Sequence, residues 1–333
     1  MKSFLFLCLF LTIMVSCNAL RTFAAIKTVL VIESYHEGYA WDASYKKGII
    51  SELGGEYKVS FFQMDTKRIP SSLYERQANL AWENYKEVNP DLVILGDDNA
   101  LKFLGPRFLK TKTPVVYLGI NNNPRAYLDS HVFDMTGVLE RPLLKRSVPV
   151  ISQIIGPSMK KLLILFDSGT TSKVALTHVF KNNRKIKIKN IDVDLLFIGY
   201  WDLWQKTVLS AKEKGYDALI IGLYHTIVDS DGKHVDAEAV LKWSANHASV
   251  PPFCFWDFAV GKDKTVGGLV LFGETQGKAA ANIAKQILEG KKQVKDIFPV
   301  VGAQGRYLFS HSGLQKFNLK LPDNIQIRSD FVD

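Results

Sequence analysis

Cysteine and long apolar runs are both scarce in this sequence of 333 residues. Of the three cysteines, only Cys254 lies beyond the N-terminal segment, and a lone cysteine cannot form an internal disulfide. This excludes a disulfide-stapled scaffold, so the fold has to rest on its hydrophobic core. The one strongly apolar run, Phe4–Val15, is shorter than the roughly 20 residues that cross a bilayer, which excludes a polytopic membrane protein.

The short apolar run behind Lys2 is typical of a secretory signal, which we place at residues 1–25. The protein is therefore expected to act outside the cytoplasm, in the periplasm or an equivalent compartment. Two cleavage alternatives stay open. Cys17 lies in a stretch that resembles a lipoprotein box and would be lipidated, which would make a lipid anchor the only membrane contact. Cleavage after Ala19 or Ala25 would instead release a freely soluble chain.

Motifs for nucleic-acid binding, cofactors and catalysis are missing as well. The formal charge of +9 falls to +7 without Lys2 and Arg21, and its basic residues are spread along the chain, so we expect no nucleic-acid partner. There is no Gly-x-Ser-x-Gly elbow, no Gly-x-Gly-x-x-Gly after the first strand and no phosphate loop, so we expect no cofactor. The seven histidines lack metal-ligand spacing, and we expect no metal.

What the chain does contain is a regular alternation of short apolar runs with amphipathic stretches. Hydrophobic residues make up 47% of the sequence, which is enough for buried cores. Strands are predicted at 28–32, 58–63, 92–95 and 115–118, and a second series at 161–166, 191–197, 218–222 and 253–255. Such unalternating apolar strands are typical of parallel sheets covered by helices. The sequence therefore predicts an α/β fold with two doubly wound, Rossmann-like lobes.

Ligands of doubly wound sheets bind at the carboxyl ends of the strands, and polar and aromatic residues gather in those loops here. The candidates from the first lobe are Ser34, Tyr35, Trp41, Asp97, Asp98 and Asn121. Those from the second lobe are Thr170, Tyr200, His225 and Trp256. We expect both sets to face one shared cleft between the lobes.

The residue types suggest distinct roles in that cleft. Aromatic side chains such as Trp41 and Trp256 would form stacking walls. Asp97 would neutralise a cationic group of the ligand, whereas Asp98 is expected to cap the helix that follows. Glu140 and Glu274 lie near expected crossings between the lobes. Either of them would contact the ligand in a closed form or only fix the hinge.

Several blocks of the sequence together resemble a known family. They are VLVIESYHEGYAWDASYKKGI, DLVILGDDNAL and GETQGKAAANIAKQILEG, and the likeness extends over about residues 28–325. The chain resembles the type I periplasmic solute-binding proteins, the ABC-transporter substrate-binding family related to tryptophan-binding proteins. It departs from the tryptophan-binding members at Asp97 and Asp98, where their turn is smaller and less acidic.

The resemblance implies an exported binding protein without enzymatic activity. One lobe would comprise residues 26–140 and 274–300, and the other residues 141–273 and 301–333. The lobes would close by a hinge on a small polar or aromatic molecule and present it to a membrane permease for uptake. A monomer is the expected state. An amino acid, an aromatic compound and a modified base all fit as ligands.

Two alternatives remain at this point. Relatives with similar loops occur beside sensor kinases and cyclic-dinucleotide enzymes, so the protein would then be the receptor of a membrane sensor. A secreted hydrolase is the weaker alternative, because the adjacent carboxylates of Asp97 and Asp98 are awkwardly placed for acid/base work across one substrate.

Overall fold

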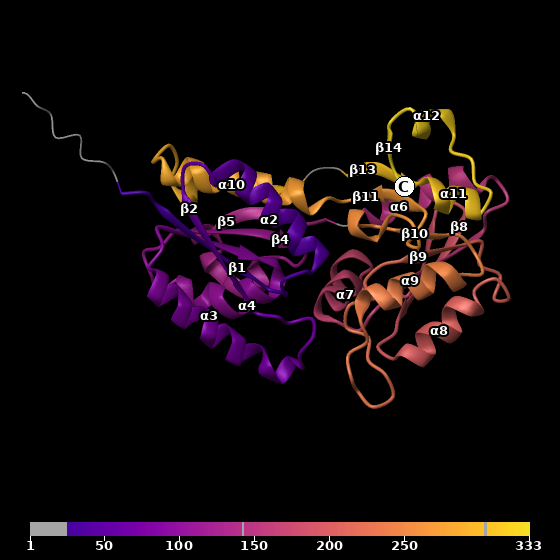
Figure 1. Cartoon of the computed structure of the whole chain (residues 1–333), viewed down its shortest axis with the longest axis horizontal. Coiled ribbons are helices and arrows are strands. Elements are labelled where there is room, and N and C mark those ends of the chain that lie inside the picture. The colour runs from indigo at the N-terminus through magenta and orange to yellow at the C-terminus, as the bar shows by residue number, and fades with distance from the viewer. Residues whose placement is uncertain (1–24, 142, 303–304) are drawn as a thin grey trace, which may run out of the picture.

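The computed structural model describes residues 25–141, 143–302 and 305–333. The predicted signal segment up to residue 24, with the lipidation candidate Cys17, lies outside these residues. Two sheets lie side by side in the described chain, each covered by helices (Figure 1). We call the part built on the first sheet, residues 25–140 and 273–301, the first lobe. The second lobe comprises residues 143–272 and 305–333.

The first sheet has six strands in the order β12-β5-β4-β3-β1-β2, all paired in parallel. Its strands are β1 (Thr28–Glu33), β2 (Lys58–Gln63), β3 (Leu92–Gly96), β4 (Val115–Ile120), β5 (Thr136–Leu139) and β12 (Val300–Val301). The predicted boundary after residue 300 falls inside β12, whose Val301 pairs with Leu139.

The second sheet follows the same winding, in the order β10-β9-β6-β8-β7, with only the edge strand β7 antiparallel. Its strands are β6 (Lys161–Phe166), β7 (Lys185–Ile188), β8 (Ile191–Phe197), β9 (Ala218–Ile221) and β10 (Pro252–Cys254). A third, small sheet contains β11 (Gly267–Val270), β13 (Arg306–Ser310) and β14 (Ser329–Val332). The two doubly wound parallel sheets confirm the predicted α/β class.

The helices cover both faces of the sheets. They are α2 (Ala40–Leu53), α3 (Tyr74–Val88), α4 (Asp97–Phe108), α5 (Arg125–Leu128), α6 (Leu144–Ile155), α7 (Thr170–Val174), α8 (Trp201–Leu209), α9 (Ala237–His247), α10 (Gly273–Leu288), α11 (His311–Lys316) and α12 (Asp323–Gln326). Short turns complete the set: the 3₁₀ turns η1 (Ser71–Leu73), η2 (Asp129–Asp134), η4 (Asp257–Ala259) and η5 (Val294–Asp296), and the π-helical turn η3 (Ala175–Val179).

Alternation along the buried strands divides each lobe into two cores. In β1, Val29 and Val31 point to the core under α2 and α10, whereas Leu30 and Ile32 point to the core under α3 and α4. Successive side chains of a strand point to opposite faces, which is why a run of unbroken apolar residues fits a sheet buried on both sides. The second sheet is divided in the same way between α6 on one face and α8 and α9 on the other.

Helix α10 follows the second-lobe strand β11 in sequence but packs on the first lobe, beside α2 (Figure 1). Glycines let the two helix backbones touch. A Cβ on Gly277 would lie 2.0 Å from the carbonyl oxygen of Tyr45, and one on Gly48 would lie 2.2 Å from that of Glu274. This close packing fixes α2, the helix that carries Trp41 into the space between the lobes.

Candidate functional site

A small cavity lies where the carboxyl ends of the strands of both lobes face each other. First-lobe residues in its lining follow β1, β2, β3, β4 and β5, and second-lobe residues follow β6, β9 and β10. The lining residues are Tyr35, Tyr39, Trp41, Lys67, Asp97, Asn121, Glu140, Thr171, Leu223, Trp256 and Phe258. This is the location at which doubly wound sheets bind their ligands.

Asp97 is the most unusual residue of the cavity wall. It opens α4 with a φ of 68°, a left-handed conformation that Asp and Asn tolerate better than other non-glycine residues. Its Oδ1 accepts a long hydrogen bond of 3.5 Å from the Tyr35 hydroxyl, while the buried Oδ2 has no partner. Burial, reinforced by Asp42 and Glu140, raises the pKa of Asp97 well above its ordinary value. A cation beside Oδ2 would stabilise the ionised carboxylate and so lower this pKa.

Two donors in the same wall also lack acceptors. The indole Nε1 of Trp41 is buried without a hydrogen-bond partner. The ammonium of Lys67, on a side chain only 7% exposed, lies 4.6 Å from the centre of the Tyr35 ring and 5.7 Å from that of Tyr39. Within the described parts of the chain it forms no ion pair. The cavity therefore offers one free acceptor and two free donors, enclosed by aromatic rings.

Aromatic side chains connect the two lobes across the cavity. The Tyr35 hydroxyl lies 3.4 Å from Oγ1 of Thr171, which belongs to the second lobe. Tyr39 meets the ring of His225 edge-on, with 4.8 Å between centroids, and lies 6.1 Å from Phe258. These side chains come from both lobes, so the two lobes contact each other across the cavity in this structure.

Glu140 lies where the chain first leaves the first lobe, and it is hydrogen-bonded to both lobes. Its Oε1 accepts a 2.6 Å hydrogen bond from the indole of Trp256 in the second lobe, and its Oε2 accepts one of 2.9 Å from the Asn121 amide. Burial raises the pKa of Glu140 from 4.5 to about 7, against the opposing effect of these two hydrogen bonds. The carboxyl group thus titrates near neutral pH, at a contact between the lobes.

This titration predicts a pH-dependent stability. The folded protein holds the Glu140 proton more tightly than the unfolded chain, so the stabilisation is complete below pH 4.5 and is lost as pH rises to about 7. The shift corresponds to about 3 kcal/mol. Glu140→Gln keeps the size and an acceptor but cannot ionise. Urea unfolding between pH 4.5 and 8 should show the wild type losing stability relative to this variant; parallel profiles would contradict the assignment.

Five of the residues singled out from the sequence line the cavity: Tyr35, Trp41, Asp97, Asn121 and Trp256. Each follows the carboxyl end of a predicted strand or begins the helix after it. Among the described residues, no group of three His, Cys, Asp or Glu side chains is placed to hold a metal ion. Cys254 is buried and free, and burial raises the pKa of its thiol to about 12, as expected for a core residue rather than a nucleophile.

Two candidates of the first lobe lie behind the cavity wall. Ser34 donates from Oγ to the Gly96 carbonyl and accepts from the Ala100 amide, so its hydroxyl joins β1 to the start of α4. Asp98 was expected to cap α4. Its oxygens instead accept from the backbone amides of Asn121 and Asn122, which orders the turn after β4.

The four other candidates lie elsewhere. Thr170 lines a groove outside the cavity, whereas its neighbour Thr171 lines the cavity itself. Tyr200 is 58% exposed ahead of α8. Glu274 forms ion pairs with Lys47 and Lys278 on the α2–α10 surface, and these lysines lower its pKa.

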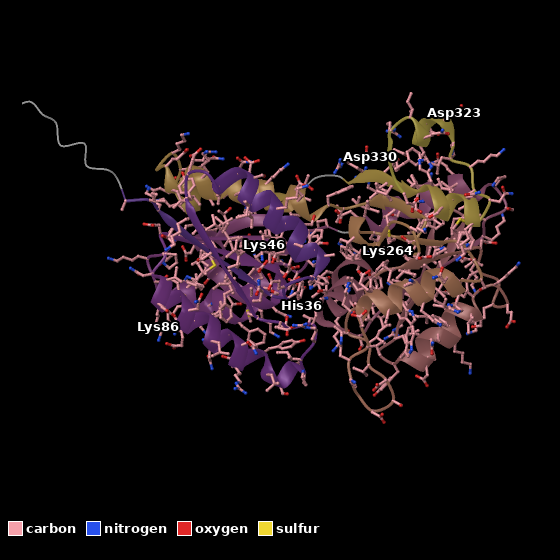
Figure 2. The ribbon with its side chains drawn as sticks, viewed as in Figure 1. His36, Lys46, Lys86, Lys264, Asp323 and Asp330 are labelled. Carbon is pink, nitrogen blue, oxygen red and sulfur yellow. The ribbon has the colours of Figure 1, made fainter. Side chains whose placement is uncertain are left out.

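His225 faces a neighbouring cavity, which Arg68, His234 and His36 also line. Figure 2 shows His36 at the boundary between the two halves of the molecule. Burial lowers the pKa of His225 well below its ordinary value, so the ring is neutral where it touches Tyr39.

Six lining residues were not among the sequence candidates: Tyr39, Lys67, Glu140, Thr171, Leu223 and Phe258. Glu140 was considered as a residue near a crossing that would contact the ligand in a closed form or only fix the hinge. Tyr39 lies in the same loop as Tyr35, and its place in that aromatic loop after β1 could have identified it as a cavity residue. Lys67 follows β2, a strand whose end carried no conspicuous polar cluster, and it enters the cavity because the loop after Met64 bends back onto β1 through hydrogen bonds to Glu33 and Ser34.

Comparison with known proteins bears on this geometry. The model of the family described as ABC transporter substrate binding protein matches residues 85–332, about three quarters of the chain. The chain belongs to this family. It is therefore a substrate-binding protein of an ABC transporter and not an enzyme, which removes the hydrolase alternative. No sequence among the curated proteins matches it significantly.

Solved structures support the same fold at low sequence identity. An ABC domain from Streptococcus pneumonia in complex with L-Trp is 16% identical and superposes with a TM-score of 0.67, covering 93% of this chain and 100% of the other. A conserved domain protein from Vibrio cholerae is 15% identical, with a TM-score of 0.68 and the same coverage. A ligand-free, open substrate-binding protein with adhesive properties from Clostridium difficile is 13% identical, with a TM-score of 0.61 and coverage of 92% and 100%.

These likenesses show the fold of type I periplasmic binding proteins, as the sequence resemblance implied. In the part of this substrate-binding protein that the structure describes, no helix is both long and apolar enough to cross a bilayer.

Proposed function

We propose that this substrate-binding protein works outside the cytoplasm and closes its two lobes on a small ligand that carries an ammonium group and a hydrogen-bond acceptor. The observation that carries the proposal is a set of unpartnered polar groups around one cavity, of which Asp97 Oδ2 and Trp41 Nε1 are fully buried. Asp97 Oδ2 would accept from the ammonium, and Trp41 Nε1 and the Lys67 ammonium would donate to the acceptor. Buried polar groups without partners are destabilising, so a ligand that satisfies all three gains affinity.

The aromatic lining supports an organic ammonium rather than a bare metal ion. Tyr35, Tyr39 and Trp256 present ring surfaces to the cavity, and ring faces attract organic cations. Lys67 already occupies one such position in the closed form, beside Tyr35. An amino acid or a related amine meets these requirements, and the pneumococcal neighbour's L-Trp complex is consistent with that class.

Closure would also create the surface that the transporter recognises. The contacts of Tyr35 with Thr171, Tyr39 with His225, and Glu140 with Trp256 all join residues of different lobes. A ligand bound between the lobes favours the closed state by its differential affinity for that state. The membrane subunits of the transporter would then distinguish loaded from empty protein by the relative position of the lobes.

A thermal-shift screen tests the proposal on the chain from Ile26 to Asp333. The panel contains amino acids, amines, polyamines, aromatic acids, nucleobases and sugars. A ligand at about a hundred times its dissociation constant stabilises the fold by roughly 2.7 kcal/mol, which raises the unfolding midpoint by several degrees. We expect responses from compounds with an ammonium group. Stabilisation by neutral sugars or ammonium-free acids alone would contradict the proposal.

A further inference from the structure

A groove lies between the lobes, outside the cavity. The first lobe lines it with residues 67–71 and Tyr74, and the second lobe lines it with loops that contain Thr170, Lys173 and Thr226. Lys67 lines both the groove and the cavity. The Lys67 side chain is therefore part of both walls, and a ligand that extends past it from the cavity would enter the groove.

The charge of the groove is of one sign. Its lining contains Lys67, Arg68 and Lys173, together with His234, and no aspartate or glutamate among the residues described. The Arg68 guanidinium donates two hydrogen bonds to the Asp65 carboxylate, of 2.8 and 2.7 Å, which offsets one positive charge at the rim. The two lysines remain, one from each lobe.

Asp167, a second-lobe acid that hydrogen-bonds the groove loops, forms no ion pair with these lysines. Asp167 is fully buried beneath the groove, and its oxygens accept from the Gly169 and Thr226 amides and from the Ser172 hydroxyl. Lys173 is exposed and forms no ion pair with any residue in the described ranges.

Two polar groups at the groove lack partners. The Lys67 side chain is more than nine-tenths buried, and no described residue hydrogen-bonds its ammonium. Oγ1 of Thr226, in the second-lobe wall, is buried without a partner as well. An ammonium without a protein acceptor, on a side chain that is largely buried, attracts an anion, because a charge-assisted hydrogen bond is the strongest it can form. The burial of Lys67 is thus an observation separate from the exposed charge of Lys173.

We propose that this groove is an anion subsite, which holds a carboxylate or phosphate group at the far end of the same ligand. The inference rests on the proposed function, because it assigns the ammonium of that ligand to Asp97 and its anionic end to Lys67 and Lys173. The ligand class is then a molecule with an ammonium group at one end and a carboxylate or phosphate at the other. Closing the lobes brings Lys67 and Lys173 to the same groove.

Inorganic phosphate, titrated into the purified protein by calorimetry, tests the subsite alone. Loss of one charge-assisted hydrogen bond weakens binding by about tenfold, which is the change expected for Lys173→Gln. Lys206→Gln removes an exposed lysine on α8 outside the groove and should bind phosphate like the wild type. Equal phosphate binding by the wild type and both variants would overturn the subsite.

A matched pair of probes tests whether one ligand supplies the anion. L-tyrosylglycine and L-tyrosylglycinamide share an ammonium group and differ in the terminal carboxylate. The wild type should bind the acid about tenfold more tightly than the amide, and Lys173→Gln should remove that preference. Equal affinity for the acid and the amide overturns the inference of one bipolar ligand. If phosphate raises the affinity for the amide to that of the acid, the anion comes from solution instead.

Failure of the proposed function gives a different result. Asp97 lies in the cavity and does not line the groove, and its carboxylate only opposes an anion at Lys67, so Asp97→Asn should not weaken phosphate binding. Phosphate binding that depends on Lys173, combined with dipeptide binding that does not depend on Asp97, retains the subsite and overturns the ammonium site. The reverse pattern overturns the subsite only.

Discussion

Replacing Asp97 by Asn should weaken binding of the ammonium-bearing ligand by about a hundredfold or more, since breaking a buried ion pair costs 3–5 kcal/mol. The same change should stabilise the ligand-free protein. Burial raises the pKa of Asp97 and leaves Oδ2 without a partner, so the neutral amide relieves an unfavourable charge. A single variant that gains stability and loses affinity is the signature of a group kept for its ligand.

Asn is the informative substitution because Asp97 has a φ of 68°, a conformation that Asn adopts at lower cost than Ala. Asp98→Asn is the matched contrast one residue away. Asp98 accepts hydrogen bonds from the Asn121 and Asn122 amides, so its replacement should lower stability. Calorimetric binding and urea unfolding measure both properties. Undiminished affinity in Asp97→Asn, or a loss of stability in the ligand-free form, would refute the role assigned to Asp97.

The second large effect is expected at the contact between α2 and α10. Gly277→Ala would place a methyl group 2.0 Å from the Tyr45 carbonyl oxygen, where backbone has to move to make room. Overpacking of a tight core contact costs about 1–3 kcal/mol and more where the backbone resists. We expect a loss of about 3 kcal/mol in the free energy of unfolding, accompanied by weaker ligand binding because α2 carries Trp41.

Gly55→Ala is the control, because a Cβ at Gly55 meets no atom within 4 Å. That variant should unfold within about 0.5 kcal/mol of the wild type. Urea unfolding of the wild type, Gly277→Ala and Gly55→Ala measures whether the stability loss is specific to the contact between the helices. If Gly277→Ala and Gly55→Ala have the same stability, the close approach of the helices is not what holds α10 to the first lobe.

The sequence predicted the strands and hence the edge at which the cavity lies. A run such as Leu92–Leu95 has no polar interruption, so both its burial and the position of its carboxyl end follow from the pattern. Asp97 and Asn121 were found for that reason. The choice between adjacent residues was harder to predict. Thr170 and Thr171 begin α7, and successive helical residues point about 100° apart, so only Thr171 lines the cavity.

Lys67 was not predicted from the sequence, and Glu140 was left between a ligand contact and a hinge role, because both positions depend on tertiary contacts. Lys67 enters the site because the loop after β2 hydrogen-bonds back to Glu33 and Ser34, a tertiary contact with no periodic signal. The role of Glu140 depends on Trp256, which lies 116 positions away in the sequence. Tyr200 is the opposite case, a predicted cavity residue that does not line the cavity. It stands at a strand end, but its side chain is exposed ahead of α8.

The return of α10 to the first lobe also governs the order in which this protein acquires its structure. Gly48 meets Glu274 and Lys278, residues made more than two hundred positions later, so a nascent chain that has emerged only through β5 leaves the apolar face of α2 without its partner helix. Contacts of such high contact order form late and slowly. The five-stranded sheet of the second lobe, by contrast, is complete at β10, before α10 exists. Of the two large sheets, the one that begins the sequence is therefore the one completed last, when β12 is added.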